Sequence, residues 1–318
     1  MTVSTLKATI LRQRERLTAL LGEPMYRLAR RCAAVIDDRA ALERALEEGL
    51  ATIAHSKHLY VLDAAGRQLT DNITRDGADP SHYGRDRSDR PYMENIIGST
   101  DFKLSEAYIS RNKKRPSLTA VQVIRDGEGG HIGFLGADYD LRELPGTEGL
   151  YQESRAWRQI KGDPAIRGGL FLQRRTQSEM DDHLDDVLPL MTELMVEHGI
   201  FHGKLHFASS RATVWLVDDP YAYRLLSLDE LIDPDICLAY PHRPYTERAI
   251  VAAEKIAPIF EMFRRLRFAD DTVYLRAGSL NVCNGMVALN FSCDGSHYLR
   301  YDEFLEKGLE FWFGTPSP

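Results

Sequence analysis

Cysteine, long apolar runs and excess positive charge are all scarce in this chain of 318 residues. It has four cysteines, and no two of them form a CxxC pair, so a zinc site or a redox dithiol has little support. No stretch approaches the ~20 consecutive apolar residues that cross a membrane. The formal net charge of −7 argues against a nucleic-acid-binding surface, because such surfaces are basic. We therefore expect no metal, no membrane span and no nucleic-acid partner.

Sequence motifs for catalysis are missing as well. The chain contains no Walker loop, no dinucleotide-binding glycine fingerprint after a strand, and no HExxH motif. Kinase, cyclase and methyl-accepting motifs are also absent. The first residues carry Arg12, Arg14 and Arg16 where a secretory leader needs an apolar run. We therefore expect a soluble, cytoplasmic protein with no catalytic residues and no cofactor.

The length of the chain favours two domains, because a single core rarely grows so large. A hydrophobic content of 43% with 27% charged residues is ordinary for a globular protein. The expected parts are an N-terminal helical segment at residues 1–56, a sheet domain at 57–145, a linker at 146–175 and an α+β domain at 176–318.

The N-terminal segment has helical periodicity. Leu6, Ile10 and Leu17 fall on one face of a helix expected at residues 3–21. Gly22-Glu23-Pro24 is expected to break that helix, and a second would cover residues 25–36. Asp37-Asp38 can then cap a third helix. These helices either lead into the following sheet or form a homodimerisation surface.

From about residue 57 the hydrophobic period changes to two, which indicates strands. Short turns that contain Gly66 and Gly127 join antiparallel pairs. The expected strands are residues 59–62, 68–70, 107–110, 118–124 and 132–139. The sequence therefore predicts an α+β fold, in which N-terminal helices precede an antiparallel sheet of about five strands.

The C-terminal half also mixes the two periods, so a second α+β domain is expected. The expected helices are residues 177–197, 250–268 and 301–313. The expected strands are residues 201–207, 212–217, 222–228, 236–240, 272–282 and 286–292. The last two strands would form a hairpin around Asn284-Gly285. A second, diverged PAS-like module is one interpretation of this half.

Polar residues concentrate in residues 83–141. Arg90 lies in a compact turn, where its guanidinium can hold a ligand carboxylate or pair with an aspartate of its own loop. Tyr108 and Ser110 are two apart on a strand and so face the same side. Asp138 shares a strand face with apolar residues, where a charge needs a partner, either a ligand ammonium or Arg90. Such a set suits the capture of a small zwitterion or cation.

Three short motifs in this region appear in a fixed order. They are Arg90-Pro91-Tyr92-Met93, Tyr108-Ile109-Ser110 and the strand Gly133-Phe134-Leu135-Gly136-Ala137-Asp138. Together they resemble the ligand-binding core of a Cache domain, the extracytoplasmic-PAS-like sensor fold of bacterial receptors. The resemblance covers residues 35–145, less than half of the chain. It implies a PAS-like antiparallel sheet with a small-molecule pocket on one face.

The resemblance also implies a set of ligand-binding residues. These are Arg90, Tyr92, Tyr108 and Asp138, with Tyr83, Arg85 and Ser110 at the edge of the pocket. The arginine would hold a ligand carboxylate, and Tyr92 would stack on the ligand or lie buried under the loop. Met93 and Ser110 depart from the family, which often has tyrosine at the first position and, in amino-acid sensors, aspartate at the second. Asp140, nearer the strand end, is expected to be solvated.

Two functions are consistent with these residues. The first is a sensor in signal transduction that binds an amino acid, an amine or a small organic acid without catalysis, while the C-terminal domain transmits the signal or dimerises. The second is an enzyme with a regulatory Cache-like domain and an active site in the C-terminal domain. That active site would draw on Cys283, Cys293, His297 or His206. A shared pocket lined by these four side chains would favour the enzyme.

Overall fold

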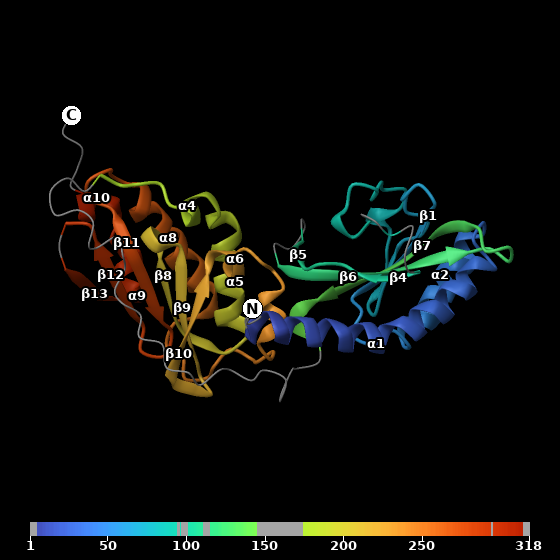
Figure 1. Ribbon diagram of the computed structural model, residues 1–318, viewed down its shortest axis with the longest axis horizontal. Helices are drawn as coiled ribbons and strands as arrows, with labels where there is room; N and C mark the ends of the chain where they lie inside the picture. The colour runs from blue at the N-terminus through green and yellow to red at the C-terminus, as the bar shows by residue number, and fades with distance from the viewer. Residues whose placement is uncertain are drawn as a thin grey trace. The chain divides into compact units, whose positions relative to one another are not determined.

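The computed structural model describes residues 5–93, 96, 101–110, 115–144, 174–293 and 295–313. They divide into two compact units. Among the described residues the first comprises residues 5–144 with Leu238–Pro241, and the second comprises residues 174–237 and 242–313. Each unit contains an antiparallel sheet with helices against it (Figure 1). The predicted α+β class with N-terminal helices is therefore confirmed. The region predicted as a linker lies largely outside the described residues.

The first unit begins with one long helix, α1 (Thr5–Ala33). The predicted break at residues 22–24 is wrong, because α1 runs through Pro24. Its buried side, with Leu17, Leu21 and Leu28 at 1–2% exposure, continues in phase across the proline. Proline removes only one intrahelical hydrogen bond, and the continuous apolar stripe against the sheet offsets that loss. The helix packs against three strands of the first sheet, β4 (Phe102–Leu104), β6 (Pro116–Arg125) and β7 (His131–Asp140).

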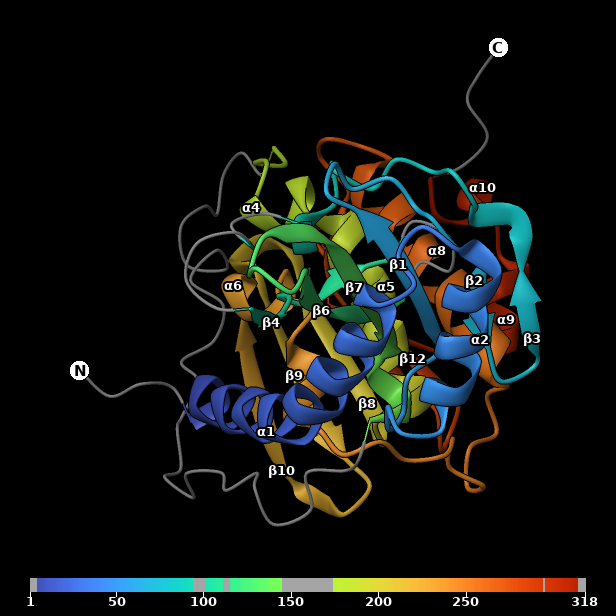
Figure 2. The ribbon, with the colours of Figure 1, turned by 90° about the vertical axis from the view of Figure 1, so that its right-hand side faces the viewer.

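Helix α2 (Arg39–Leu50) follows after a short turn. The carboxylate of Asp38 accepts a hydrogen bond from the Ala41 amide at 3.0 Å, so the predicted cap is confirmed. Leu42 and Leu46 are buried against the rest of the unit, at 1% and 0% exposure. Both helices lie on the same side of the first sheet (Figures 1 and 2).

The first sheet has seven strands in the order β3-β2-β1-β7-β6-β4, and β5 also pairs with β6. The strands are β1 (His58–Asp63), β2 (Asn72–Thr74), β3 (Gly77–Asp79), β4 (Phe102–Leu104), β5 (Tyr108–Ile109), β6 (Pro116–Arg125) and β7 (His131–Asp140). All of their pairings are antiparallel. Three short 3-10 turns complete the unit: η1 (Pro80–His82), η2 (Pro91–Met93) and η3 (Leu141–Glu143).

The loop-bearing face of this sheet is shaped by a glycine in strand β7. Tyr60 on β1 is paired with Gly136 in the antiparallel register. A Cβ atom at position 136 would lie 2.3 Å from the Tyr60 ring, so only glycine lets that ring lie across the strand. Tyr60, Tyr92 and Phe134 belong to the apolar cluster of this face. The ring therefore directs the Tyr60 hydroxyl along the sheet toward Asp138, which follows Gly136 by two residues on β7.

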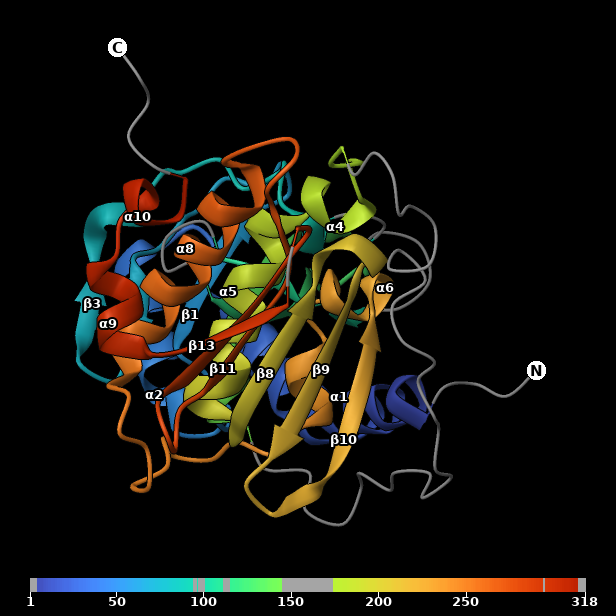
Figure 3. The same ribbon diagram turned by 90° about the vertical axis from the view of Figure 1, so that its left-hand side faces the viewer.

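The second unit contains a six-stranded sheet in the order β10-β9-β8-β11-β12-β13. Its strands are β8 (Ile200–His206), β9 (Arg211–Leu216), β10 (Asp219–Ser227), β11 (Leu275–Asn281), β12 (Met286–Phe291) and β13 (Ser296–Arg300). Helices α5 (Leu184–Glu197) and α8 (Ile256–Phe268) pack on each other and on β8 and β11 respectively (Figure 3). Each helix precedes a three-strand meander, so the unit is built from the same helix-and-three-strand pattern twice.

Shorter elements fill the remainder of this unit. They are α4 (Glu179–Asp182), η4 (Phe207–Ser209), α6 (Leu228–Leu231), α7 (Ile236–Ala239), η5 (Ala253–Lys255), α9 (Tyr301–Glu306) and α10 (Leu309–Phe313). Inside the unit, Arg267 of α8 forms a buried ion pair with Asp181 of α4 at 2.7 Å. This pair connects α4, at the start of the unit, to α8, the second of its two long helices.

The structure of the C-terminal half differs from the prediction at three places. Residues 236–240 do not form a strand, because α7 occupies Ile236–Ala239. A short apolar run cannot be assigned to strand or helix by periodicity alone. Strand β13 was not predicted, since its side chains alternate between exposed and half-buried and so lack a buried stripe. The predicted helix at 301–313 is divided into α9 and α10.

Candidate functional site

A cavity of about 130 Å³ lies on the loop-bearing face of the first sheet. It is lined by Lys57, His58, Asn72, His82, Arg85, Arg87, Arg90, Tyr92, Tyr108, Ser110, Arg115, Ser117, Asp138, Tyr139 and Asp140. Six of the seven residues named from the sequence are in this set. The exception is Tyr83, which is 53% exposed and lies under the guanidinium of Arg39, 3.8 Å from its ring centroid.

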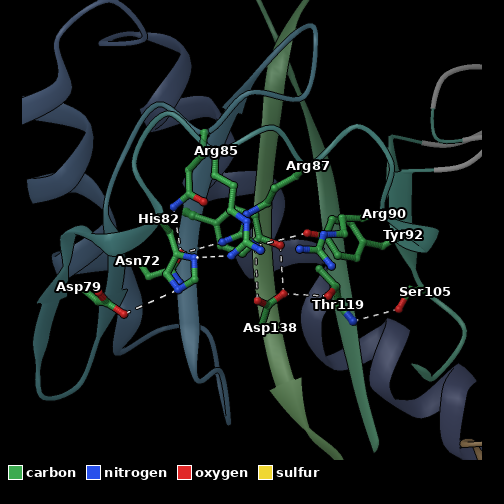
Figure 4. A network of polar contacts seen from close by, with 12 residues as sticks. Asn72, Asp79, His82, Arg85, Arg87, Arg90, Tyr92, Ser105, Thr119 and Asp138 are labelled. Atoms are coloured by element: carbon green, nitrogen blue, oxygen red, sulfur yellow. Dashed lines mark hydrogen bonds and ion pairs between the residues drawn. The ribbon is translucent and has the colours of Figure 1, made fainter. Parts of the chain in front are cut away.

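Asp138 is at the centre of a hydrogen-bond network (Figure 4). Its Oδ1 accepts from the Tyr60 hydroxyl at 3.0 Å and from the Thr119 hydroxyl at 2.8 Å. The Tyr108 hydroxyl lies 2.8 Å from the Thr119 hydroxyl and extends the chain of contacts. Asp138, Thr119 and His58 are neighbours in one cross-strand row. The antiparallel register therefore places the carboxylate against partners on both adjacent strands.

Arg87 supplies the nearest cation to Asp138, and the sequence reasoning missed it. Its side chain is 8% exposed, and Nη1 lies 3.8 Å from Asp138 Oδ2. The guanidinium also donates to the Tyr92 hydroxyl at 3.3 Å and to Asn72 Oδ1 at 3.1 Å. It stacks over the Tyr60 ring at 3.9 Å. Its Nε is buried without a hydrogen-bond partner among the described residues.

The charge on Arg87 persists despite burial. Burial by itself lowers the pKa of Arg87, but its neighbours Tyr60, Tyr92 and Asp138 raise the pKa further, so the pKa lies above its ordinary value. A guanidinium is already charged at every physiological pH. The buried loop segment therefore brings a permanent positive charge to the cavity.

The tyrosines of the cavity remain protonated. Burial and then the Asp138 carboxylate raise the pKa values of Tyr60, Tyr92 and Tyr108 above the ordinary value. The Tyr92 and Tyr108 rings are 6.0 Å apart and tilted by 43°. Each hydroxyl can therefore donate a hydrogen bond, and the two rings form an apolar wall beside the polar network.

Arg90 and Arg85 lie on the same loop as Arg87. Arg90 immediately precedes η2, and its side chain is 15% exposed. Its Nε is 3.8 Å from Asp89 Oδ1, which is beyond hydrogen-bond distance. Arg85 Nη1 is 3.1 Å from Nδ1 of His82. Burial and then the nearby Arg87 lower the pKa of His82, so this ring is neutral near pH 7.

The opposite end of the cavity contains a compact ion cluster around Asp140. Lys57 Nζ is 3.0 Å from Asp140 Oδ2 and 2.8 Å from Glu143 Oε1, and Arg142 is paired with Asp140 as well. Asp140 is 4% exposed, so the expectation that it is solvated is wrong. Burial raises the pKa of Asp140, while Lys57 and Arg115 act in the opposite direction. Two cations and two carboxylates balance each other in this cluster.

Three of the residues considered for catalysis in the second unit, His206, His297 and Cys293, lie in separate surroundings. His206 lies 2.9 Å from the Thr213 hydroxyl, and the ring of His297 packs on Phe291 and Trp312. Cys293 is exposed. Across the part of the chain that the structure describes, no three His, Cys, Asp or Glu side chains gather as a metal site. In the same residues, every helix is too short or too polar to span a bilayer.

Comparisons with other proteins give weak structural likenesses. A scan against family models finds no match, and a search of curated proteins finds none either. An extracellular ligand binding receptor from Desulfohalobium retbaense DSM5692 matches 43% of this chain and 24% of its own, with 14% identity and a TM-score of 0.33.

Two chemoreceptor ligand-binding domains are also similar. That of Pseudomonas fluorescens CtaA, in complex with L-isoleucine, matches with 22% identity over 43% of this chain and 52% of its own, at a TM-score of 0.32. That of Campylobacter jejuni Tlp3, in complex with L-norvaline, matches with 17% identity over 44% of this chain and 57% of its own, at a TM-score of 0.35. This chain thus spans less than two thirds of each of these three structures.

Proposed function

We propose that the first unit is a small-molecule sensor of the Cache type. Its cavity would hold an amino acid, an amine or a small organic acid, and the protein would perform no catalysis on it. Occupancy would be transmitted through the second unit or a partner. The observation that carries this proposal is the convergence of Arg90, Arg87, the tyrosine pair and Asp138 on one small cavity.

The chemistry of the lining supports binding. The guanidinium groups of Arg87 and Arg90 are planar and can each donate two parallel hydrogen bonds to a carboxylate. The protonated hydroxyls of Tyr92 and Tyr108 offer neutral polar contacts, and the rings of the same two residues offer an apolar wall. A small cavity with a few convergent polar groups is the usual form of a ligand site.

A thermal-shift screen of the full chain with amino acids, amines and organic acids tests the proposal. A ligand at ~100 times its dissociation constant should raise the free energy of unfolding by ~2.7 kcal/mol. Arg90→Ala should then abolish the shift, because a buried arginine–carboxylate contact contributes ~2–5 kcal/mol when one partner is removed.

Arg75→Ala is the matched control, since Arg75 is an exposed arginine of the β2–β3 turn and does not line the cavity. It should bind like the parent protein. If no compound in the screen shifts the transition, the sensor proposal fails. If Arg90→Ala binds as tightly as the parent, the ligand is held elsewhere.

A further inference from the structure

The cavity is strongly cationic although the chain as a whole is acidic. Its lining contains five side chains with positive charge, Lys57, Arg85, Arg87, Arg90 and Arg115, against two carboxylates, Asp138 and Asp140. The difference is an excess of three positive charges. The whole chain has a formal net charge of −7. The lining therefore has a local excess of positive charge, opposite in sign to the net charge of the chain.

Local pairing leaves this excess unchanged. Asp140 is neutralised inside the cluster with Lys57 and Arg142, and that cluster also contains Glu143. Among the four remaining arginines of the lining, Arg115 also lowers the pKa of Asp140, and Arg90 lies 3.8 Å from the exposed Asp89. The second carboxylate of the lining is that of Asp138. Figure 4 shows three of these arginines, Arg85, Arg87 and Arg90, on the same loop beside Asp138.

Asp138 itself has little capacity left for a ligand cation. Its Oδ1 already accepts two hydrogen bonds, from Tyr60 and Thr119. Its Oδ2 faces the guanidinium of Arg87 at 3.8 Å. The position where a ligand ammonium would meet the carboxylate is therefore next to the protein's own buried cation. Like charges in a partly desolvated site repel strongly.

From this charge distribution we propose that the preferred ligand is a small dianion, a molecule with two acidic groups a few bonds apart. This inference rests on the proposed sensor function of the same cavity. One acid group pairs with Arg90, and the second compensates the other arginines of the lining. A carboxylate and a phosphate share this chemistry, and both suit the guanidinium fork.

A matched ligand series tests the inference by isothermal titration calorimetry on the full chain. Malonate, succinate and glutarate are compared with the monoacids propionate, butyrate and valerate, and succinate is also compared with the zwitterion 4-aminobutyrate. Phosphoglycolate, which has one phosphate and one carboxylate, is the phosphate arm and is compared with the monoacid glycolate. At least one dianion should bind ~10-fold or more tightly than its singly charged or zwitterionic counterpart, because it gains a further charge-assisted contact.

Two variants locate the second acid group. Arg115→Gln and Arg85→Gln should each lower the affinity for the best dianion ~10-fold or more and change the affinity for its monoacid much less. Arg75→Gln, on the exposed turn, should change neither. Glutamine keeps hydrogen-bonding capacity and removes the charge. Added salt should weaken dianion binding more than monoacid binding.

The results distinguish failure of the dianion inference from failure of the sensor proposal. If a monoacid or 4-aminobutyrate binds as tightly as the matched dianion, the dianion inference is overturned while the sensor function stands. If dianions bind tightly but Arg115→Gln and Arg85→Gln leave the ratio of dianion to monoacid affinity unchanged, these arginines do not set the preference and the inference also fails. Absence of binding by every compound, here and in the broader screen, contradicts both proposals.

Discussion

Replacing Asp138 by asparagine removes one charge from the cavity and barely changes the shape of the side chain. The asparagine oxygen can still accept from Tyr60 and Thr119, which contact Asp138 Oδ1 at 3.0 and 2.8 Å. The amide nitrogen then takes the position of Oδ2 and faces Arg87, which is 3.8 Å from that oxygen. Two donors confront each other, and the Arg87 side chain, which is 8% exposed, loses the carboxylate beside it.

The size of the effect follows from this geometry. Two unit charges ~4 Å apart interact by roughly 4 kcal/mol at an effective dielectric constant of ~20. Solvent weakens the interaction, since the Asp138 side chain is 21% exposed. Hydrogen bonds to charged groups contribute ~1.5–3 kcal/mol. We therefore expect Asp138→Asn to lower the free energy of unfolding of the first unit by about 2 kcal/mol.

Differential scanning calorimetry without ligand measures this loss and can separate the transitions of the two units. For a unit of ~150 residues the melting temperature should fall by about 4–8 °C. Asp76→Asn is the control, because Asp76 is an exposed aspartate of the β2–β3 turn. Its effect should stay within ~0.5 kcal/mol. A melting temperature for Asp138→Asn equal to that of the control would refute the view that Asp138 compensates Arg87.

Two further predictions concern the second unit. Asp181→Asn leaves Arg267, whose side chain is 1% exposed, without its carboxylate partner. We expect the free energy of unfolding of that unit, measured by calorimetry, to fall by ~3–5 kcal/mol, while ligand binding to the first unit stays unchanged. An unaltered unfolding transition would contradict a stabilising ion pair. Burial and then Lys204 lower the pKa of His202 from 6.5 to about 4. The folded state therefore favours the neutral ring, so stability is full above pH 6.5 and declines as the pH falls toward 4. His202→Gln should flatten that decline in melting temperature, and identical pH profiles for the variant and the parent protein would show that another group is responsible.

Much of the fold could be predicted from local patterns. The change from helical to two-residue period near residue 57 indicates the first sheet, and the Asp38 cap marks the start of α2. Local patterns failed where tertiary packing decides. The break expected at Pro24 does not occur, because a stripe of buried leucines continues across it. The apolar run at Ile236–Ala239 forms a helix, and periodicity could not predict this because four residues are too few to show a period.

The candidate site was predictable where strand alternation places side chains. Tyr108 and Asp138 lie on strands, and both line the same cavity. The hairpin register could also have indicated Thr119, which is directly opposite Asp138. Arg87 offered no such pattern, because it lies in an irregular loop rich in charged residues. Tyr83 was placed at the pocket edge by the family resemblance, but the loop turns its ring toward Arg39.

The charge of the cavity is a property of the whole set of lining residues, and no single motif contains it. The sequence reasoning placed Arg90 in the pocket and Arg85 at its edge, and it left Asp138 available for a ligand ammonium. The structure adds Arg87 from the same loop and Arg115 from the segment before β6. Since Arg87 already compensates Asp138, the carboxylates of the lining do not balance the other arginines, and Arg90 lies 3.8 Å from the exposed Asp89 outside the lining. A ligand with negative charge would supply the balance. The motif thus indicates where a ligand binds, and the loop residues between its elements determine which charge that ligand should carry.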